Sequence, residues 1–329
     1  MKLAIVILNW NGKKLLEQFL PSVVQYSNEA TIYVADNAST DDSVNFISQT
    51  YPSIKIIQNK VNGGYAKGYN DALQHIDADV FCLLNSDVEV TENWLTPIIE
   101  TFKGESNTAI IQPKLLDFKN KDMFEYAGAA GGFIDKYGYP YCRGRIFDTI
   151  EKDTNQYDDA TEIFWASGAC LFIRSNVYKQ LNGLDELFFA HMEEIDLCWR
   201  AKNSGYSIKY IGNSTVYHVG GATLKATNPK KTFLNFRNSL FAITKNAKGN
   251  ILGILFIRLI LDGIAGIKFL FELKFKHAFA ITKAHFSYYR YLSTMLKQRK
   301  NIKTRIKHYQ RKSIVFDYFI KKNKKFINL

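Results

Sequence analysis

Short apolar runs alternate with helix-like stretches over the first hundred residues. The apolar runs are residues 3–8, 31–35, 54–57 and 80–84, and the helix-like stretches lie near residues 13–26, 41–50 and 65–75. Short apolar strands that alternate with helices are typical of a mostly parallel sheet covered on both faces. The pattern therefore predicts a Rossmann-like α/β fold in which these strands all end at one edge of the sheet.

Small and polar residues follow each predicted strand. They form the segments LNWNG (8–12), DNASTD (36–41), NGGYAKGYN (62–70) and NSDVE (85–89). An acid after the second strand, Asp36, can accept hydrogen bonds from a ribose or a base edge. Glycines let a ligand approach the backbone, and the start of the following helix favours a phosphate. The four loops together predict a nucleotide site at this edge.

Each loop also has a simpler interpretation. Residues 36–41 are suited to a turn and a helix cap, and Asp87 to a helix N-cap. The glycine run 62–70 has neither P-loop nor GxGxxG spacing. Four such loops on one predicted edge nevertheless favour a shared ligand site over four separate turns.

The composition indicates a folded protein with reduced cysteines. The chain has 329 residues, 47% hydrophobic and 22% charged, which is typical of a folded protein. Its four cysteines lie far apart with no CxxC pair, which indicates reduced thiols in a cytosolic setting and argues against a disulfide framework or a zinc site. The apolar N-terminus lacks a small-residue cleavage site, so it is interpreted as a strand rather than a signal peptide.

Charge divides the chain into an acidic body and a basic tail. From residue 225 to the end there are 24 Lys and Arg but only 3 Asp and Glu, whereas the preceding part has 19 and 28. Such a tail faces a polyanion, either lipid headgroups or nucleic acid. No nucleic-acid recognition module is present in the sequence, so lipid is favoured.

Residues 251–275 are strongly apolar but carry five charges, which makes them poor candidates for a membrane span. They suit an amphipathic helix in the membrane interface, and the basic runs 297–312 and 321–325 add attraction to anionic lipid. We therefore predict a helical membrane-associating region over residues 246–329. The alternative is that residues 251–275 pack on the catalytic domain.

The ordered series VILNWNG, VADNASTDDS, NGGYAKGYN and LLNSDVEV resembles the nucleotide-binding half of family 2 glycosyltransferases, which have the GT-A fold. The resemblance continues through FWASGACLF, HMEEIDLCWR and TVYHVGG, and it is nearest to the bacterial rhamnosyltransferase-like branch that builds surface polysaccharides. It covers roughly residues 1–245 and implies a nucleotide-binding half (1–112) and an acceptor and catalytic half (113–245).

By position, the resemblance implies nucleotide contacts from all four loops. The implied residues are Leu8, Asn9, Trp10, Asp36, Asn62, Gly64, Lys67, Asn70, Asn85, Ser86 and Asp87. Asn85-Ser86-Asp87 takes the place of the family's DxD motif, and the Asn at its first position leaves Asp87 as the implied metal ligand.

A departing nucleoside diphosphate develops negative charge that a Mg²⁺ or Mn²⁺ ion would neutralise, and such hard cations prefer oxygen ligands. A histidine ligand would favour manganese. His218 matches the family's metal-ligand histidine, although without the resemblance an ordinary strand-end histidine would be the better interpretation.

The segment HMEEID (191–196) places three carboxylates within four residues. Acids at a helix start are commonly dipole partners, yet like charges crowded in a cleft raise the pKa of one of them, as a catalytic base requires. The segment resembles the family's ED motif, which implies Glu194 as the base, with Glu in place of Asp, and Glu193 in acceptor binding. Trp165 and Gly168 fall where the acceptor sugar is held. Trp165 would stack on that sugar or else belong to the core.

These features predict an inverting, metal-dependent hexosyltransferase at the inner, cytoplasmic face of the cell membrane. Its donor would be a dTDP-, UDP- or GDP-linked sugar, and the resemblance to the rhamnosyltransferase-like branch suggests rhamnose as that sugar. Its acceptor would be a glycan or lipid-linked glycan. Two alternatives remain at this point: a nucleotidyltransferase, and a catalytically inactive carbohydrate- or lipid-binding protein on the same scaffold.

Overall fold

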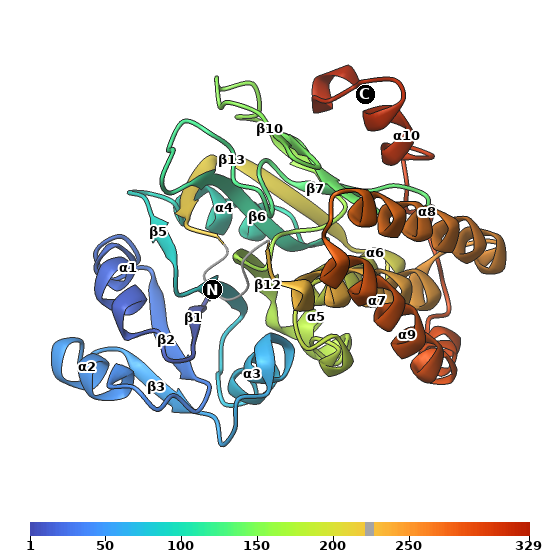
Figure 1. The fold of residues 1–329 in the computed structure, drawn as a ribbon. Coiled ribbons are helices and arrows are strands. Elements are labelled where there is room, and N and C mark those ends of the chain that lie inside the picture. Colours follow the sequence, from blue (N-terminus) through green and yellow to red (C-terminus); the bar gives the residue numbers. More distant parts are fainter. Residues whose placement is uncertain (221–226) are drawn as a thin grey trace.

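The computed structural model describes residues 1–220 and 227–329, and within them the chain forms one large mixed sheet and one small antiparallel sheet (Figure 1). The large sheet has the strand order β11-β13-β6-β12-β4-β1-β2-β3, and the short β5 pairs with β13. Its strands are β1 (Leu3–Asn9), β2 (Ala30–Asp36), β3 (Lys55–Gln58), β4 (Val80–Asn85), β5 (Val88–Val90), β6 (Thr108–Asp117), β11 (Ala160–Glu162), β12 (Cys170–Arg174) and β13 (Ser207–His218).

The N-terminal half of the sheet is parallel, as predicted: β3, β2, β1 and β4 run the same way, with Asn9 opposite Asp36 and Leu8 opposite Asn85. Beyond β4 the sheet is mixed: β12 is antiparallel to both β4 and β6, and β13 is parallel to β6. The four predicted strands are confirmed to within one or two residues at each end.

Helices cover both faces of the sheet and bury alternate residues of its strands. In β1, Ala4 and Val6 pack into one apolar cluster, whereas Leu3, Ile5 and Ile7 pack into another on the opposite face. The helices are α1 (Lys13–Gln25), α2 (Ser43–Thr50), α3 (Gly64–Leu73), α4 (Thr96–Gly104), α5 (Ser175–Gln180), α6 (Glu193–Asn203), α7 (Pro229–Asn246), α8 (Ile251–Phe271), α9 (Phe275–Asn301) and α10 (Ile314–Phe319). The predicted GT-A-like α/β fold with a helical C-terminal region is confirmed.

The C-terminal residues return to the body of the protein. The small sheet consists of β7 (Gly132–Ile134), β8 (Pro140–Cys142), β9 (Arg145–Ile146) and β10 (Thr149–Ile150). Asp135, just after β7, accepts a hydrogen bond from the backbone N–H of Ile314, and Phe326 packs on the ring of Phe133 at 5.3 Å between centroids. The boundary that we predicted at residue 246 is therefore no break in the core. The membrane-associating role of residues 246–329 remains a prediction, because these contacts do not test it.

The helices α7, α8 and α9 lie together beside the large sheet (Figure 1). All four cysteines are buried and free. Within the described residues, no helix combines the length and the apolar character that crossing a bilayer requires.

Candidate active site

The ends of β1 and β2 bring the first two predicted loops into contact. The Asn9 side-chain Nδ2 donates to Asp36 Oδ1 (3.1 Å) and to Ser39 Oγ (3.2 Å), while the backbone N–H of Ser39 donates to Asp36 Oδ2 (2.9 Å). Asn9 is fully buried and its Oδ1 has no hydrogen-bond partner among the described residues. The acid after the second strand is thus held in one orientation by its neighbours.

The first strand-end loop is tightly packed near the fourth. A Cβ atom on Gly12 would lie 2.4 Å from Asn9 Oδ1 and 3.8 Å from Ser86 Oγ, so only a glycine fits beside Asn9. Leu8 is half-buried, whereas the Trp10 ring is 54% exposed. An exposed indole at the carboxyl edge of the sheet is available for stacking on a nucleotide base, and this contact remains a prediction for Trp10.

The third loop joins the two halves of the chain. Asn62 Oδ1 accepts hydrogen bonds from Asn37 Nδ2 (2.9 Å) and from the backbone N–H of Gly64 (3.0 Å). Gly64 has a φ of +81°, and a Cβ atom there would meet the carbonyl oxygen of Phe189 at 2.8 Å. The next residue, Tyr65, donates its backbone N–H to that same carbonyl (3.0 Å). Gly64 therefore permits α3 to begin directly against the HMEEID region.

Lys67 and Asn70, predicted to line the nucleotide, have protein partners. Lys67 Nζ pairs with Asp71 Oδ1 at 2.9 Å, and both residues are half-buried. Asn70 accepts hydrogen bonds from Tyr178 Oη (2.6 Å) and the backbone N–H of Leu184 (3.0 Å), and donates to the Leu184 carbonyl (2.8 Å). The Asn70 side chain thus holds the turn that precedes residues 191–196, which favours a positioning role for Asn70. A nucleotide contact of Lys67 remains a prediction.

The fourth loop meets the end of β13. His218 Nε2 lies 3.1 Å from Asp87 Oδ1 and 3.4 Å from Asn85 Nδ2, and His218 Nδ1 lies 3.3 Å from Glu125 Oε1. Asp87, Glu125 and His218 are all buried. The sequence analysis did not identify Glu125, because no recognisable motif surrounds it in the sequence. Its contact with His218 arises only when the chain folds against β13.

This cluster changes the protonation of His218. Burial alone would lower the pKa of His218, but the charges of and hydrogen bonds to Glu125 and Asp87 outweigh it and raise the pKa to about 10. With Nδ1 directed at Glu125, the ring presents Nε2 on the same side as Asp87. A carboxylate behind a histidine ligand fixes the ring orientation and increases its basicity in metal sites.

The residues present fit a divalent ion that the protein binds together with a diphosphate. Within residues 1–220 and 227–329, no set of three His, Cys, Asp or Glu side chains is arranged to hold a metal ion. If Asp87 and His218 are the protein ligands, as predicted, the remaining positions would fall to phosphate oxygens and water, as is common in Mg²⁺ and Mn²⁺ sites on nucleotides. Gly221, the last residue of the TVYHVGG motif, lies outside the described residues.

The segment before α6 has an unusual backbone. Phe189, His191 and Met192 adopt positive φ values of 66°, 68° and 73°. Non-glycine residues in this region cost about 1–3 kcal/mol each and persist only where surrounding contacts impose them. Asn238, fully buried on α7, supplies such contacts: its Nδ2 lies within hydrogen-bond distance of the carbonyl oxygens of Phe188, Ala190 and His191 (3.0, 3.0 and 2.7 Å).

Glu193 and Glu194 begin α6 and each has a buried Oε2 without a partner among the described residues. Burial raises the pKa of Glu194 to about 7, against backbone hydrogen bonds that lower it. Burial and the neighbouring Glu194 charge raise the pKa of Glu193 well above its ordinary value. Burial and the nearby Lys231 charge lower the pKa of His191 to about 4. A carboxylate that titrates near neutral pH is what a general base requires.

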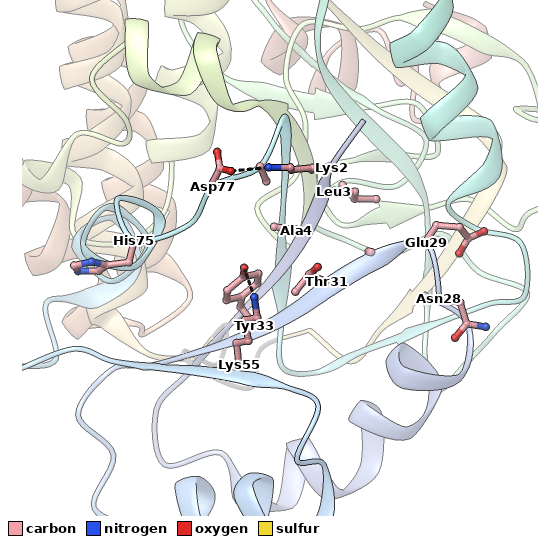
Figure 2. A pocket seen from close by; sticks show the side chains of 12 residues that line it. Lys2, Leu3, Ala4, Asn28, Glu29, Thr31, Tyr33, Lys55, His75 and Asp77 are labelled. Atoms are coloured by element: carbon pink, nitrogen blue, oxygen red, sulfur yellow. Dashed lines mark hydrogen bonds and ion pairs between the residues drawn. The ribbon is translucent and has the colours of Figure 1, made fainter.

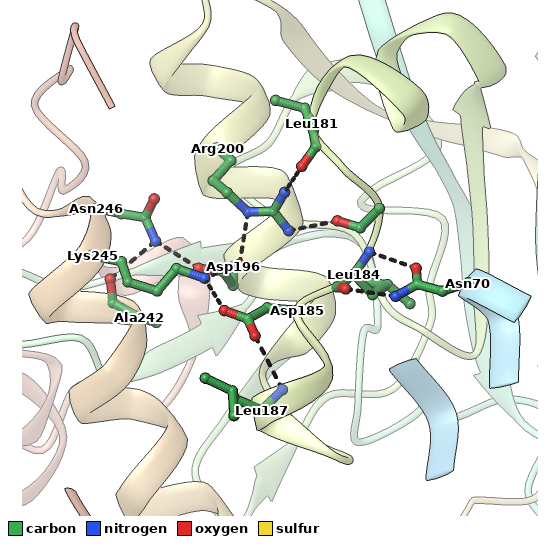
Figure 3. A network of polar contacts seen from close by, with 11 residues as sticks. Asn70, Leu181, Leu184, Asp185, Leu187, Asp196, Arg200, Ala242, Lys245 and Asn246 are labelled. Atoms are coloured by element: carbon green, nitrogen blue, oxygen red, sulfur yellow. Dashed lines mark hydrogen bonds and ion pairs between the residues drawn. The ribbon is translucent and has the colours of Figure 1, made fainter. Parts of the chain in front are cut away.

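Asp196, one turn further along α6, is a structural acid whose carboxylate is fully paired. Figure 3 shows it between Arg200, Lys245 and Asn246: Oδ2 accepts from Arg200 Nε (2.8 Å) and Lys245 Nζ (2.9 Å), and Oδ1 accepts from Asn246 Nδ2 (2.8 Å). Although burial opposes it, the charges of Lys245 and Arg200 keep the pKa of Asp196 below its ordinary value. Lys245 also bonds to Asp185 at 2.6 Å, so α7 fixes both ends of the segment 185–196.

Of the predicted acceptor residues, Trp165 belongs to the core. Its side chain is 3% exposed, its Nε1 donates to the Phe133 carbonyl (2.8 Å), and a Cβ atom on Gly132 would overlap the indole. Stacking of Trp165 on an acceptor sugar is thus not supported, because the side chain is buried in the protein. The Gly168 carbonyl accepts a hydrogen bond from Tyr65 Oη (2.7 Å), and an acceptor role for Gly168 stays a prediction.

A shallow pocket exists at the other end of the strands, where β1, β2 and β3 begin (Figure 2). It is lined by Lys2, Thr31, Lys55, His75 and Asp77, among others, and Lys2 pairs with Asp77 at 2.8 Å. None of the predicted site residues lines it. In parallel sheets ligands bind at the carboxyl ends of strands, so the candidate site is the edge formed by Asn9, Asp36 and Asp87.

A Rossmann-like sheet with an acid and a histidine at its carboxyl edge and a buried carboxylate pair opposite defines the GT-A class of glycosyltransferases. The chain belongs to glycosyl transferase family 2: residues 4–181, more than half of its length, match the model of that family. This confirms the family that the four strand-end loops indicated.

A curated relative is the N-acetylglucosaminyl-diphospho-decaprenol L-rhamnosyltransferase of Mycobacterium tuberculosis, which is 24% identical over 235 residues, covering 66% of this chain and 75% of the relative. Among solved structures, the mannosyltransferase PcManGT of Pyrobaculum calidifontis in complex with GDP-Man and Mn²⁺ is similar with a TM-score of 0.55, at 13% identity, over 92% of this chain and 84% of that one. GalNAc-T7 with UDP, GalNAc and Mn²⁺ is similar with a TM-score of 0.57 at 14% identity. That match covers 75% of this chain, which spans 48% of GalNAc-T7. These two structural likenesses show the shared fold.

Proposed function

We propose that this glycosyltransferase is a metal-dependent, inverting hexosyltransferase that moves a sugar from a nucleotide to a glycan or lipid-linked glycan during cell-surface polysaccharide synthesis. The observation that carries the proposal is the cluster of Asp87, His218 and Glu125 at the strand ends. In this cluster the Asp87 carboxylate lies at Nε2 of the His218 ring and the Glu125 carboxylate lies at Nδ1. The name of the mycobacterial relative supports rhamnose as the sugar and a lipid-linked acceptor.

In this proposal the four strand-end loops bind the nucleotide. Asp36, oriented by Asn9 and Ser39, accepts hydrogen bonds from the base or ribose, and the start of α3 faces the phosphates. Asp87 and His218 would hold a Mg²⁺ or Mn²⁺ ion, which neutralises the charge of the diphosphate when bound. Glu125 keeps the His218 ring in the orientation that directs Nε2 toward Asp87.

Glu194 is the proposed base. Its carboxylate takes the proton of an acceptor hydroxyl as that oxygen forms a bond to the anomeric carbon of the donor sugar. The bond from the anomeric carbon to the diphosphate oxygen breaks in the same step, and the nucleoside diphosphate leaves with the electron pair. A single displacement inverts the anomeric configuration. The buried carboxylate of Glu193, without a partner among the described residues, is proposed to hold the acceptor hydroxyls.

The partners that follow are a dTDP-, UDP- or GDP-linked donor, and an acceptor presented at the inner face of the cell membrane. The basic C-terminal third of the chain supports a location on that membrane surface. Nucleic acid is not part of the proposal.

A thermal-shift measurement tests the site. UDP, dTDP, GDP and CMP are each added to the protein with and without Mn²⁺, because a ligand of the native state raises the melting temperature by mass action. We expect one diphosphate to raise it by several degrees only when the metal is present, and Asp87→Asn to lose that increment while keeping the ligand-free melting temperature. A folded protein with no shift for any nucleotide contradicts the proposal. Consumption of a nucleoside triphosphate with a sugar phosphate would instead establish the nucleotidyltransferase alternative.

A further inference from the structure

Helix α8 has its charges inside and its apolar residues outside. Arg258 and Asp262, 2% and 0% exposed, form an ion pair at 2.7 Å on the side of α8 that faces the protein. Arg258 also donates to the Tyr137 carbonyl (3.0 Å), and Asp262 accepts from Tyr139 Oη (2.9 Å) and lies 3.3 Å from His285 Nε2. These contacts attach α8 firmly to the small sheet and to α9, so this side of the helix is not free for another partner.

The outward side of α8 is almost entirely apolar. At 100° per residue, its exposed large side chains fall within an arc of about 140°. They are Leu252, Phe256, Ile257, Ile260, Ile264, Ile267, Leu270 and Phe271. The other exposed positions of the helix are Gly253, Gly263 and one charged residue, Lys268. We call these eight apolar side chains the α8 face. A helix surrounded by water would place its charges on this side and its isoleucines inside.

The apolar surface continues around the turn into α9. Leu273 and Phe275 in the turn are 75% and 60% exposed, and Phe279 and Phe286 follow on α9 at 61% and 72%. Contiguous apolar surface of this extent marks an interaction site rather than the scattered exposure of an ordinary surface. One side of α8 packs on the domain and the other is exposed, so the two alternatives predicted for residues 251–275 concern different sides of the same helix.

Basic residues border this surface. Lys276, Lys283 and Arg290 are exposed and follow each other at intervals of seven, which places them in a row on α9 beside Phe279 and Phe286. Lys268 and Lys274, near the turn, share Glu272 as an ion-pair partner at 3.7 and 2.7 Å. Apolar side chains flanked by Lys and Arg are typical of helices that lie in the interface of an anionic bilayer. In a two-fold pair of chains the same basic row would meet itself, which disfavours a second copy as the occupant.

The turn between α8 and α9 also lies close to the catalytic segment. Thr232 Oγ1 in the first turn of α7 is 2.7 Å from His277 Nδ1 in the first turn of α9. Two residues earlier, Lys230 Nζ lies 4.9 Å above the ring of Phe189, in the positive-φ segment that precedes Glu194. One turn of α7 thus connects the apolar turn, with Phe275, to the proposed acceptor side of the site.

We propose that the α8 face and the α8–α9 turn insert into the interfacial layer of an anionic lipid bilayer, with α8 parallel to the surface. This deepens and rests on the proposed function, because an enzyme docked in this way has its acceptor side next to the bilayer. A lipid-linked acceptor keeps its chain in the membrane while its sugar reaches Glu194.

Vesicle co-sedimentation of the full chain tests this docking. Vesicles of phosphatidylcholine with about one third phosphatidylglycerol are compared with phosphatidylcholine alone. We expect the double variant I260E/I267E to bind the anionic vesicles at least tenfold more weakly than the unchanged protein. Ile327→Glu, the same substitution at an exposed isoleucine outside the α8 face, should bind as before. The triple variant K276Q/K283Q/R290Q should lose the preference for phosphatidylglycerol, and all variants should melt within about two degrees of the unchanged protein.

Activity is measured separately on a water-soluble acceptor without vesicles, where I260E/I267E should keep its rate. Vesicle binding without any transfer activity contradicts the proposed function and leaves the docking intact. Binding of I260E/I267E equal to that of the unchanged protein overturns the docking. The same holds for a dimer in light scattering that I260E/I267E converts to a monomer, since the face would then be a contact between copies.

Discussion

The two sides of the candidate site are built in different ways. On the nucleotide side, Asn9, Asp36 and Asn85 are the last residues of adjacent parallel strands, so strand pairing alone aligns them. On the acceptor side, Glu194 follows a backbone with three positive φ values, and its position depends on contacts from α7, more than forty residues later in the chain. The first side is aligned by sheet register, whereas the second is held in a costly conformation by distant side chains. Substitutions should therefore separate nucleotide binding from transfer.

The largest expected separation comes from Glu194→Gln. Removing the proposed base should lower kcat by about a thousandfold, within the range typical of general bases, while the affinity for the nucleoside diphosphate stays unchanged. Transfer is measured by release of the nucleoside diphosphate, and affinity by calorimetry. Glu162→Gln, at an exposed position on β11, serves as the matched control. Full activity of the Glu194 variant would assign the base elsewhere.

The pH dependence of kcat/KM provides a second test of Glu194 as the base. Because burial raises the pKa of Glu194 to about 7, the base loses activity by protonation as the pH falls through neutrality. We expect kcat/KM to fall about tenfold for each pH unit below that pKa. Nucleotide binding should change less over this range. A rate that stays constant from pH 8 to pH 5.5 would be incompatible with this base.

Glu125 tests the nucleotide side. Glu125→Gln keeps the size of the side chain but removes the carboxylate behind His218, and such changes typically weaken metal affinity by about 10- to 100-fold. The measurement is a titration of Mn²⁺ followed by its paramagnetic resonance, which does not depend on turnover. Saturating Mn²⁺ should restore most of the transfer rate. Unchanged Mn²⁺ affinity would show that Glu125 has no influence on the ion.

Asn238 tests the acceptor side and has the smallest expected effect. Asn238→Ala leaves the carbonyl groups of Ala190 and His191 without their donor, whereas the Phe188 carbonyl keeps the Ala190 N–H and Arg237. The loss should destabilise the protein by about 1–3 kcal/mol. Because this segment carries the proposed base, we expect a several-fold lower kcat with unchanged nucleotide affinity. Chemical denaturation and calorimetry measure the two effects. Equal losses in nucleotide binding and kcat would indicate that the two sides are not separable.

The nucleotide side of the site could be predicted from the sequence, whereas its tertiary contacts could not. The apolar runs predict β1 to β4, and the polar residues after them predict the nucleotide edge, because a strand and the loop that follows it are neighbours in the chain. The pair of Glu125 with His218 could not be predicted, because 93 residues separate them and the segment around Glu125 has no distinctive pattern. Trp165 shows the opposite limit. Its residue type suits both a sugar platform and a core residue, and only packing against Gly132 and Phe133 decides between them.

The sequence by itself determined the α/β order of the chain, the family, the polar strand ends and the contrast between an acidic body and a basic tail. These features are written in local pattern, in motif order and in composition, so no coordinates are required to recognise them. Only the tertiary structure decided which carboxylates are structural and which are available, since burial and partners distinguish Asp196 from Glu194. It also decided that α8 turns its ion pair inward and its isoleucines outward. The apolar pattern of α8 does not by itself show which side of the helix faces the protein. The orientation is set by the partners of Arg258 and Asp262, which lie in the turn between β7 and β8 and on α9.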